Sequence, residues 1–171
     1  MIHLNIGSNL NSKHGTKYDN INIAINLLSK SNVKVKKISN FYQTPSYPNQ
    51  RFPKFLNVGL LADYEGSEFS LFDKTRSIEK KIGRIKTKKN EPRIIDIDII
   101  DFKNKTKVSN ELILPHPKCH LRNFVLFPIL QIDPNWFHPI FKKNAQYFIN
   151  NLDQKSRIEI TRLQKNVNIK T

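Results

Sequence analysis

Cysteine is nearly absent from the sequence, and Cys119 is the only one among 171 residues. A single cysteine excludes an internal disulfide framework and fits a reducing compartment, so we expect a cytoplasmic protein. Long apolar runs are absent too, since none approaches the ~20 residues that span a membrane. The first residues also lack the basic and apolar segments of a signal peptide. We therefore expect no membrane association.

Internal repeats and low-complexity linkers are likewise missing, and turn residues are spread evenly along the chain. A chain of this length is large enough for one domain with a real hydrophobic core. We therefore predict that residues 1–171 form a single domain, and we expect a monomer.

Acidic residues are scarce, because 14 Asp and Glu stand against 29 Lys and Arg, for a formal net charge of +15. Such a charge can indicate nucleic-acid binding. However, lysine, isoleucine and asparagine are all abundant, which is more simply explained by a compositional bias spread over the surface. Arginine is rare, and three arginines, Arg84, Arg93 and Arg122, fall where the chemical motifs cluster. A planar guanidinium suits bidentate contacts with phosphate.

Hydrophobic periodicity and turn signals predict a mixture of strands and helices without strict alternation, which is typical of an α+β fold. Strands are predicted near residues 3–6, 33–42, 55–64, 94–102 and 158–163. Helices are predicted near residues 18–28, 67–82, 121–130 and 144–152. Ser67 is a candidate N-cap and Gly83 a stop signal for the second helix. Pro128 is expected to kink the third helix or end it early.

The strongest local signal is Pro92-Arg93-Ile94-Ile95-Asp96-Ile97-Asp98-Ile99. On a strand, Asp96 and Asp98 share one face while the isoleucines share the other. Two neighbouring carboxylates repel each other and are costly to desolvate, and a hard cation such as Mg²⁺ offsets both effects. An exposed pair of solvated aspartates is the alternative. The nearby Arg84, Lys86 and Arg93 favour a magnesium site. Enzymes that transfer phosphoryl-type groups need carboxylates that bind a metal ion next to cationic side chains that bind phosphate.

No P-loop, dinucleotide-binding glycine motif or protein-kinase motif occurs, so an ATP-dependent function must depend on another family. Several segments in order resemble the 6-hydroxymethyl-7,8-dihydropterin pyrophosphokinase family. They are Ile6-Gly7-Ser8-Asn9-Leu10, Phe41-Tyr42-Gln43-Thr44-Pro45, Phe55-Leu56-Asn57, Ile78-Glu79 with Gly83-Arg84, the Pro92–Ile99 element, Leu114-Pro115-His116, and Arg122 to Pro128. The resemblance covers about residues 2–140 and leaves residues 150–171 unassigned.

The resemblance implies transfer of pyrophosphate from ATP to the hydroxymethyl group of a dihydropterin, with release of AMP, in folate biosynthesis. It also implies a ferredoxin-like antiparallel sheet with helices packed on it in three layers, α/β/α. Asp96 and Asp98 would bind two Mg²⁺ ions, and Arg84 and Arg93 would be the catalytic residues that steady the transferred group. The residues expected to bind ATP are Glu79, Lys86, His116 and Arg122.

The same resemblance places the pterin between aromatic and amide side chains. The expected pterin-binding residues are Thr44, Pro45, Phe55, Asn57 and Phe124. A flat bicyclic ring suits the two phenylalanine faces, and its amide-like edge suits an asparagine. For either phenylalanine alone a place in the core is the alternative, whereas a buried asparagine needs partners.

The chain departs from the family pattern in three places. The basic loop between Arg84 and Arg93 is one residue shorter than in well-known members and lacks a tryptophan often found there, and Glu111 stands where an arginine is common. Cys119 lies between His116 and His120, but structural zinc needs four ligands, so we interpret Cys119 as structural or incidental.

Two other function classes remain open. A basic nucleic-acid-binding module would use the lysines and the basic loop, although the paired aspartates would repel phosphate without a metal. A metal-dependent phosphoesterase would use the same aspartates and hydrolyse phosphate esters without a pterin.

Overall fold

One antiparallel sheet forms the centre of the protein. The computed structural model describes residues 1–85, 88, 90–165 and 167. The strands of the sheet are β1 (Ile2–Ser8), β2 (Lys34–Ile38), β3 (Tyr42–Thr44), β4 (Phe55–Asp63), β5 (Asp96–Phe102) and β8 (Thr161–Arg162). Their order is β5-β1-β4-β3-β8, and β2 also pairs with β4. A separate small ribbon pairs β6 (Lys107–Val108) with β7 (Ile113–Leu114).

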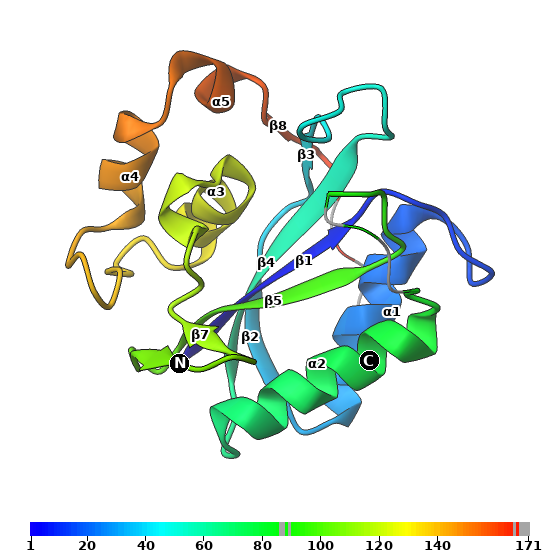
Figure 1. Ribbon diagram of the computed structural model, residues 1–171, viewed down its shortest axis with the longest axis horizontal. Helices are drawn as coiled ribbons and strands as arrows, with labels where there is room; N and C mark the ends of the chain where they lie inside the picture. Colours follow the sequence, from blue (N-terminus) through cyan, green and yellow to red (C-terminus); the bar gives the residue numbers. More distant parts are fainter. Residues whose placement is uncertain (86–87, 89, 166, 168–171) are drawn as a thin grey trace.

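Helices cover the sheet on both faces (Figure 1). On one face lie α1 (Lys17–Lys30) and α2 (Glu68–Ile82), whose buried side chains join β1 and β4 in the larger hydrophobic cluster. On the other lie α3 (Asn123–Ile132) and α4 (Ala145–Asn151), which pack in a second cluster with Ile100 and Trp136. A 3-10 turn, η1 (Cys119–Leu121), precedes α3, and a short α5 (Gln154–Ile158) follows α4. The α+β prediction is thus confirmed.

Local sequence signals explain where the first two helices begin and end. Thr16 and Asp19 form a capping box at the start of α1, which satisfies backbone donors that have no partner within the helix. Ser67 caps α2 through the backbone N–H of Ser70, and Gly83 ends it at φ 111°, a left-handed conformation that suits a residue without Cβ. Both signals on α2 were predicted.

Four predicted elements differ from the structure. The strand predicted over residues 33–42 is divided into β2, which ends at Ile38, and β3, which begins at Tyr42. The strand predicted from residue 94 begins at Asp96. Pro128 does not end α3, which continues to Ile132. A Cβ on Gly59 would lie 2.7 Å from Cβ of Pro128, so the missing side chain lets Pro128 pack closely on β4. The strand predicted over 158–163 is only β8, because the residues before it form α5.

Strand register brings the chemical motifs together on the sheet face that α3 covers. Gly7 of β1 pairs with Asn57 of β4 on one side and with Asp96 of β5 on the other. Two residues along, Asn5 pairs with Asp98. Because side chains alternate along a strand, these positions share one face. In the described part of the chain, no helix is both long and apolar enough to cross a membrane.

Candidate active site

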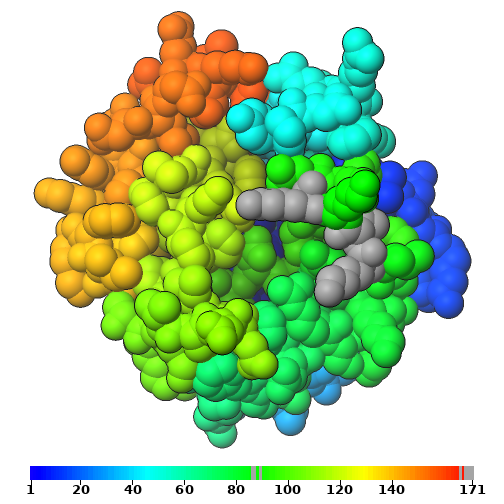
Figure 2. All heavy atoms as spheres, viewed as in Figure 1, coloured from blue at the N-terminus to red at the C-terminus, as the bar shows by residue number. Residues whose placement is uncertain are grey.

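A cavity of about 570 Å³ opens on this face of the sheet. Figure 2 shows the hollow between the yellow-green residues around 120 and the green residues of α2 and β5, with blue atoms of the N-terminal segment at its floor. Most of the predicted site residues line it. They are Thr44, Pro45, Phe55, Asn57, Arg93, Asp96, Asp98, Arg122 and Phe124. Residues predicted from separate motifs therefore meet in one cavity.

Arginines neutralise the first aspartate of the pair. Asp96 accepts hydrogen bonds from Nη1 of Arg84 on one carboxylate oxygen and from Nη1 of Arg93 on the other, both at 2.6 Å. Asn9 in turn holds the backbone of Arg93, because its Oδ1 accepts from the Arg93 N–H at 2.7 Å. Asp96 is thus clamped between two charge-assisted bonds.

The second aspartate is held less tightly. Its Oδ2 lies 3.5 Å from Nη1 of Arg122. Burial raises the pKa of Asp98 to about 7, and the negative charge of Asp96 adds to this rise. About a quarter of the side-chain surface still meets solvent, so the carboxylate lies in a recess of the cavity. Ionising Asp98 beside a second carboxylate is costly in free energy. A bound divalent cation would lower this cost, because it stabilises the charged form of the carboxylate.

Glu79 lies behind the aspartates and outside the cavity lining. It is buried, and its carboxylate accepts from the backbone N–H of Ile97 at 2.7 Å, from Arg84 and from Arg76 at 3.0 Å. Burial raises the pKa of Glu79, and Arg84 opposes that rise. Because Ile97 lies between the two aspartates, Glu79 positions this part of β5 and the guanidinium of Arg84. Its predicted ATP contact remains a prediction.

His116 lies beside Asp98 and Arg122. Its Nε2 is 4.0 Å from Oδ2 of Asp98 and 3.3 Å from Nη1 of Arg122. Burial lowers the pKa of His116 to about 4, and the charge of Arg122 adds to this effect. The backbone N–H of Lys118 faces Nδ1 at 3.2 Å, and the guanidinium of Arg122, which can only donate, faces Nε2. His116 therefore lies within reach of an anion that Arg122 binds. Lys86, also predicted to bind ATP, lies outside the described residues.

The other end of the cavity is aromatic and amide-lined. Asn57 is buried, and its side-chain contacts with the described residues are long: it accepts from Asn5 Nδ2 and donates to Thr44 Oγ1, both at 3.5 Å. Its amide group therefore keeps bonding capacity for a ligand. Arg93 lies 5.9 Å from the ring centre of Phe55, and Arg122 lies 5.5 Å from that of Phe124. The rings thus adjoin the arginines of the ionic end.

Comparison with known proteins identifies the family of the chain. The profile of 7,8-dihydro-6-hydroxymethylpterin-pyrophosphokinase (HPPK) matches residues 3–134. The chain belongs to this family. A 2-amino-4-hydroxy-6-hydroxymethyldihydropteridine pyrophosphokinase of Aquifex aeolicus is 35% identical over 114 residues, which are 67% of this chain and 71% of that protein.

Larger proteins contain a similar stretch. The folic acid synthesis protein FOL1 of Dictyostelium discoideum is 33% identical over 81% of this chain, which spans 20% of that protein. The structure of wild-type Plasmodium falciparum HPPK-DHPS superposes with a TM-score of 0.70 at 13% identity, over 94% of this chain and 47% of that one. The structural likeness shows the same fold.

The segment after the HPPK match contributes to the cavity, which the sequence reasoning missed. Asp153, Ser156 and Glu159 are part of its lining. We call residues 153–162 the C-terminal strap. Its helix starts from Asp153, whose carboxylate accepts from the Ser156 N–H at 2.8 Å, and its end forms β8. The Asp153 cap signal was readable from the sequence, whereas the contact with the cavity depends on long-range packing.

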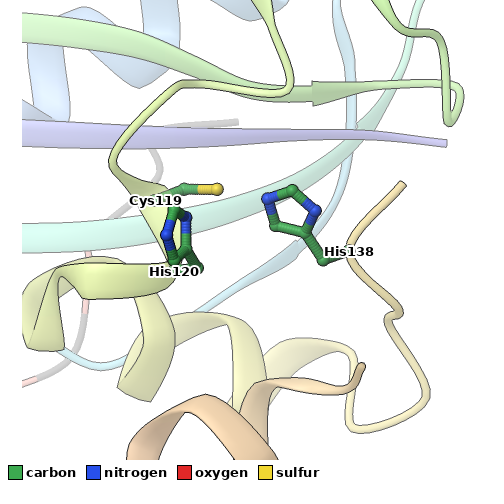
Figure 3. Close-up of side chains that lie close together, drawn as sticks. All are labelled: Cys119, His120 and His138. Carbon is green, nitrogen blue, oxygen red and sulfur yellow. The ribbon is translucent and has the colours of Figure 1, made fainter. Parts of the chain in front are cut away.

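Cys119, His120 and His138 also come together, with one possible ligand atom of each within 4.8 Å of the others (Figure 3). The Nδ1 atom of His138 accepts from the N–H groups of Ile140 and Phe141, so its ring proton sits on Nε2. A metal ion at Nε2 would have to displace this proton. Burial also raises the pKa of the Cys119 thiol to about 12. The rings of His120 and His138 lie edge to face with their centres 5.5 Å apart, and the interpretation of Cys119 as structural or incidental stays a prediction.

Proposed function

We propose that the protein transfers pyrophosphate from ATP to the hydroxymethyl group of 6-hydroxymethyl-7,8-dihydropterin and releases AMP. The observation that carries this proposal is the joining of two chemically different ends in one cavity. One end holds Asp96, Asp98, Arg93 and Arg122, with Arg84 bonded to Asp96, and the other offers aromatic faces and a buried amide. Membership of the HPPK family supports the same activity.

Asp96 and Asp98 would hold two Mg²⁺ ions. When bound, these would neutralise charge on the transferred phosphates and on the attacking oxygen. Asp98 has to lose its proton to act as a ligand, and its pKa of about 7 makes this step sensitive to pH near neutrality. Asp96 accepts hydrogen bonds from Arg84 and Arg93 on its two carboxylate oxygens.

Arg84 and Arg93 act on the phosphate oxygens. In the ligand-free arrangement both guanidinium groups bond Asp96, each through Nη1. Each guanidinium has further N–H donors, so it can keep a link to the carboxylate while it binds a phosphate oxygen. Because negative charge on the transferred group redistributes during the reaction, these contacts are expected to tighten in the transition state. Arg122 and the neutral His116 would contact the remaining phosphate oxygens.

The pterin would lie between Phe55 and Phe124, with Asn57 and the backbone at Thr44 and Pro45 on its polar edge. Stacking between aromatic faces removes the ring from water. The buried amide of Asn57 forms hydrogen bonds with a ligand edge whose donors and acceptors match its own. This pose directs the hydroxymethyl group toward the aspartates.

The direct test is the release of AMP from purified protein. AMP is expected only when ATP, Mg²⁺ and 6-hydroxymethyl-7,8-dihydropterin are all present. Hydrolysis of phosphate esters without a pterin would favour a phosphoesterase instead. Salt-dependent binding of nucleic acid without any AMP release would favour the nucleic-acid-binding alternative.

Finer features belong to the same proposal. If β3 and β8 are set aside, the strand order is β5-β1-β4-β2, which supports the ferredoxin-like description. We also propose a monomeric, cytoplasmic enzyme that uses no nucleic acid and no membrane.

A further inference from the structure

The C-terminal strap joins the two walls of the cavity's pterin end. On one wall, Asn123 donates from Nδ2 to the carbonyl of Ser156 at 2.7 Å, while its Oδ1 accepts from the N–H of Phe124 at 2.6 Å. On the other wall, β8 pairs with β3, so that Gln43 faces Thr161. The strap therefore runs from the wall of Phe124 to the strand that ends at Thr44.

A second pair of contacts fixes the far end of the strap. The backbone N–H of Leu163 donates to the carbonyl of Phe41 at 2.8 Å. Arg162 donates from Nε and Nη2 to Oδ1 of Asn40 at 3.0 and 2.7 Å. Backbone and side-chain bonds at both ends thus hold the residues between them over the cavity.

Glu159 is the strap residue with a free carboxylate. It lines the cavity and is partly buried, and among the described residues its side chain has no hydrogen bond or ion pair. The other acidic residues of the lining are engaged, Asp96 and Asp98 by arginines and Asp153 by Ser156. An unpaired carboxylate that is partly withdrawn from water favours a ligand with hydrogen-bond donors.

The position of Glu159 matches the polar edge of the proposed pterin. Tyr42 of β3 pairs with Arg162 and Gln43 with Thr161. Glu159 stands two residues before β8, at the end of α5, and lines the same cavity as Thr44 and Pro45, where the pterin's amide-like side is expected. A 2-amino-4-oxo pyrimidine ring carries adjacent N–H donors there, and a carboxylate can accept two parallel bonds from such a pair.

The charge distribution supports the same orientation. Arg84, Arg93 and Arg122 surround the aspartates at one end, whereas the strap contributes Asp153 and Glu159 to the lining. A triphosphate is attracted to the first end and repelled by the second.

We propose that Glu159 is a specificity-determining residue that accepts hydrogen bonds from the 2-amino edge of the pterin. Asn123 is the positioning residue that holds the strap against the wall of Phe124. This inference depends on the proposed function, because it assigns one edge of the proposed substrate.

The test compares Glu159→Gln with the unchanged protein in the presence of Mg²⁺ and a non-hydrolysable ATP analogue. Two ligands are titrated, 6-hydroxymethyl-7,8-dihydropterin and its analogue without the 2-amino group. Glu159→Gln is expected to bind the pterin at least tenfold more weakly and the deaminated analogue with unchanged affinity. Arg157→Gln is the matched control, because Arg157 lies on the same helix, is exposed and does not line the cavity. It should bind both ligands normally.

Three results would overturn the inference. They are pterin affinity within twofold of the unchanged protein, equal weakening for both ligands, and equal weakening for the ATP analogue. Glu159→Ala, checked for an unchanged Tm, repeats the test without the amide of glutamine. Binding of pterin by the unchanged protein is measured first, so its absence would count against the proposed function and not against Glu159 alone.

Discussion

The two ends of the cavity are built in different ways. The ionic end comes largely from one stretch of chain, in which Arg93, Asp96 and Asp98 lie within six residues and Arg84 and Glu79 pack beside them. The pterin end joins segments far apart in sequence, from β3 and β4, the start of α3 and the C-terminal strap. The ionic end is therefore determined by local spacing, and the pterin end by long-range packing.

The largest effect is expected at the aspartates. Asp96→Ala or Asp98→Ala should lower kcat by about 10³-fold or more, because each removes a metal anchor whose loss misplaces the transferred phosphates, and ~4 kcal/mol corresponds to this factor. AMP release measures the effect, and Asp73→Ala, on the exposed side of α2, is the control. Retention of more than a tenth of normal activity by both variants would contradict the metal role.

The arginines come next. Arg84→Ala and Arg93→Ala should lower kcat by roughly 10²-fold while weakening the binding of ATP by only a few fold, because their contacts tighten in the transition state. Steady-state kinetics beside calorimetric titration with an ATP analogue separates the two quantities. Weaker ATP binding with an unchanged kcat would mean that the arginines bind the ground state and the transition state equally.

At the opposite end, Asn57→Ala should weaken pterin binding by about tenfold and leave ATP affinity nearly unchanged, because the loss of one or two hydrogen bonds to one substrate costs about 1–2 kcal/mol. Titration with each ligand separately tests this. Asn22→Ala, on α1 and outside the cavity lining, controls for loss of a partly buried amide. Equal weakening of both ligands would make Asn57 a structural residue.

The smallest expected effect is on thermal stability, where substitution of Asp98 should differ from substitution of Asp96. The pKa of Asp98 is raised from 3.8 to about 7, so ionisation in the folded state opposes folding, and this penalty grows as the pH rises from about 4 to about 7. Asp98→Asn should therefore raise Tm at pH 8 by about 3 °C or more, since 1 kcal/mol corresponds to about 2–4 °C at this size. The gain should shrink at pH 5.

Thermal unfolding with a chelator present measures this difference. Asp96→Asn should show no gain, because its NH2 group cannot accept from an arginine, so that one of the two bonds to Arg84 and Arg93 is lost. A pH-independent Tm difference for Asp98→Asn would show that the carboxylate is not destabilised by burial.

This contrast also explains how far the sequence could predict the structure. Asp96 and Asp98 were predictable because strand alternation alone puts them on one face. The start and end of α2 followed from the local signals Ser67 and Gly83. By contrast, Pro128 lies inside α3 and packs closely on Gly59 of a distant strand, and no local rule anticipates that contact.

The same limit applies to the site. The gathering of Cys119 and His120 with His138 depends on how the chain returns after α3, and the place of Glu159 depends on the pairing of β8 with β3. Asn9 was predicted only as part of a family motif, without a role of its own, yet its side chain holds the backbone of Arg93. These positions are set by tertiary packing, which sequence spacing does not encode.

The most direct test of the central claim follows the phosphorus atoms. The protein is incubated with Mg²⁺, 6-hydroxymethyl-7,8-dihydropterin and ATP labelled at the β-phosphorus. If the cavity holds the pterin hydroxyl against the β-phosphate, the label should appear in a pterin diphosphate, in equal amount to AMP. Label recovered as ADP or as free pyrophosphate, with unmodified pterin, would contradict the account.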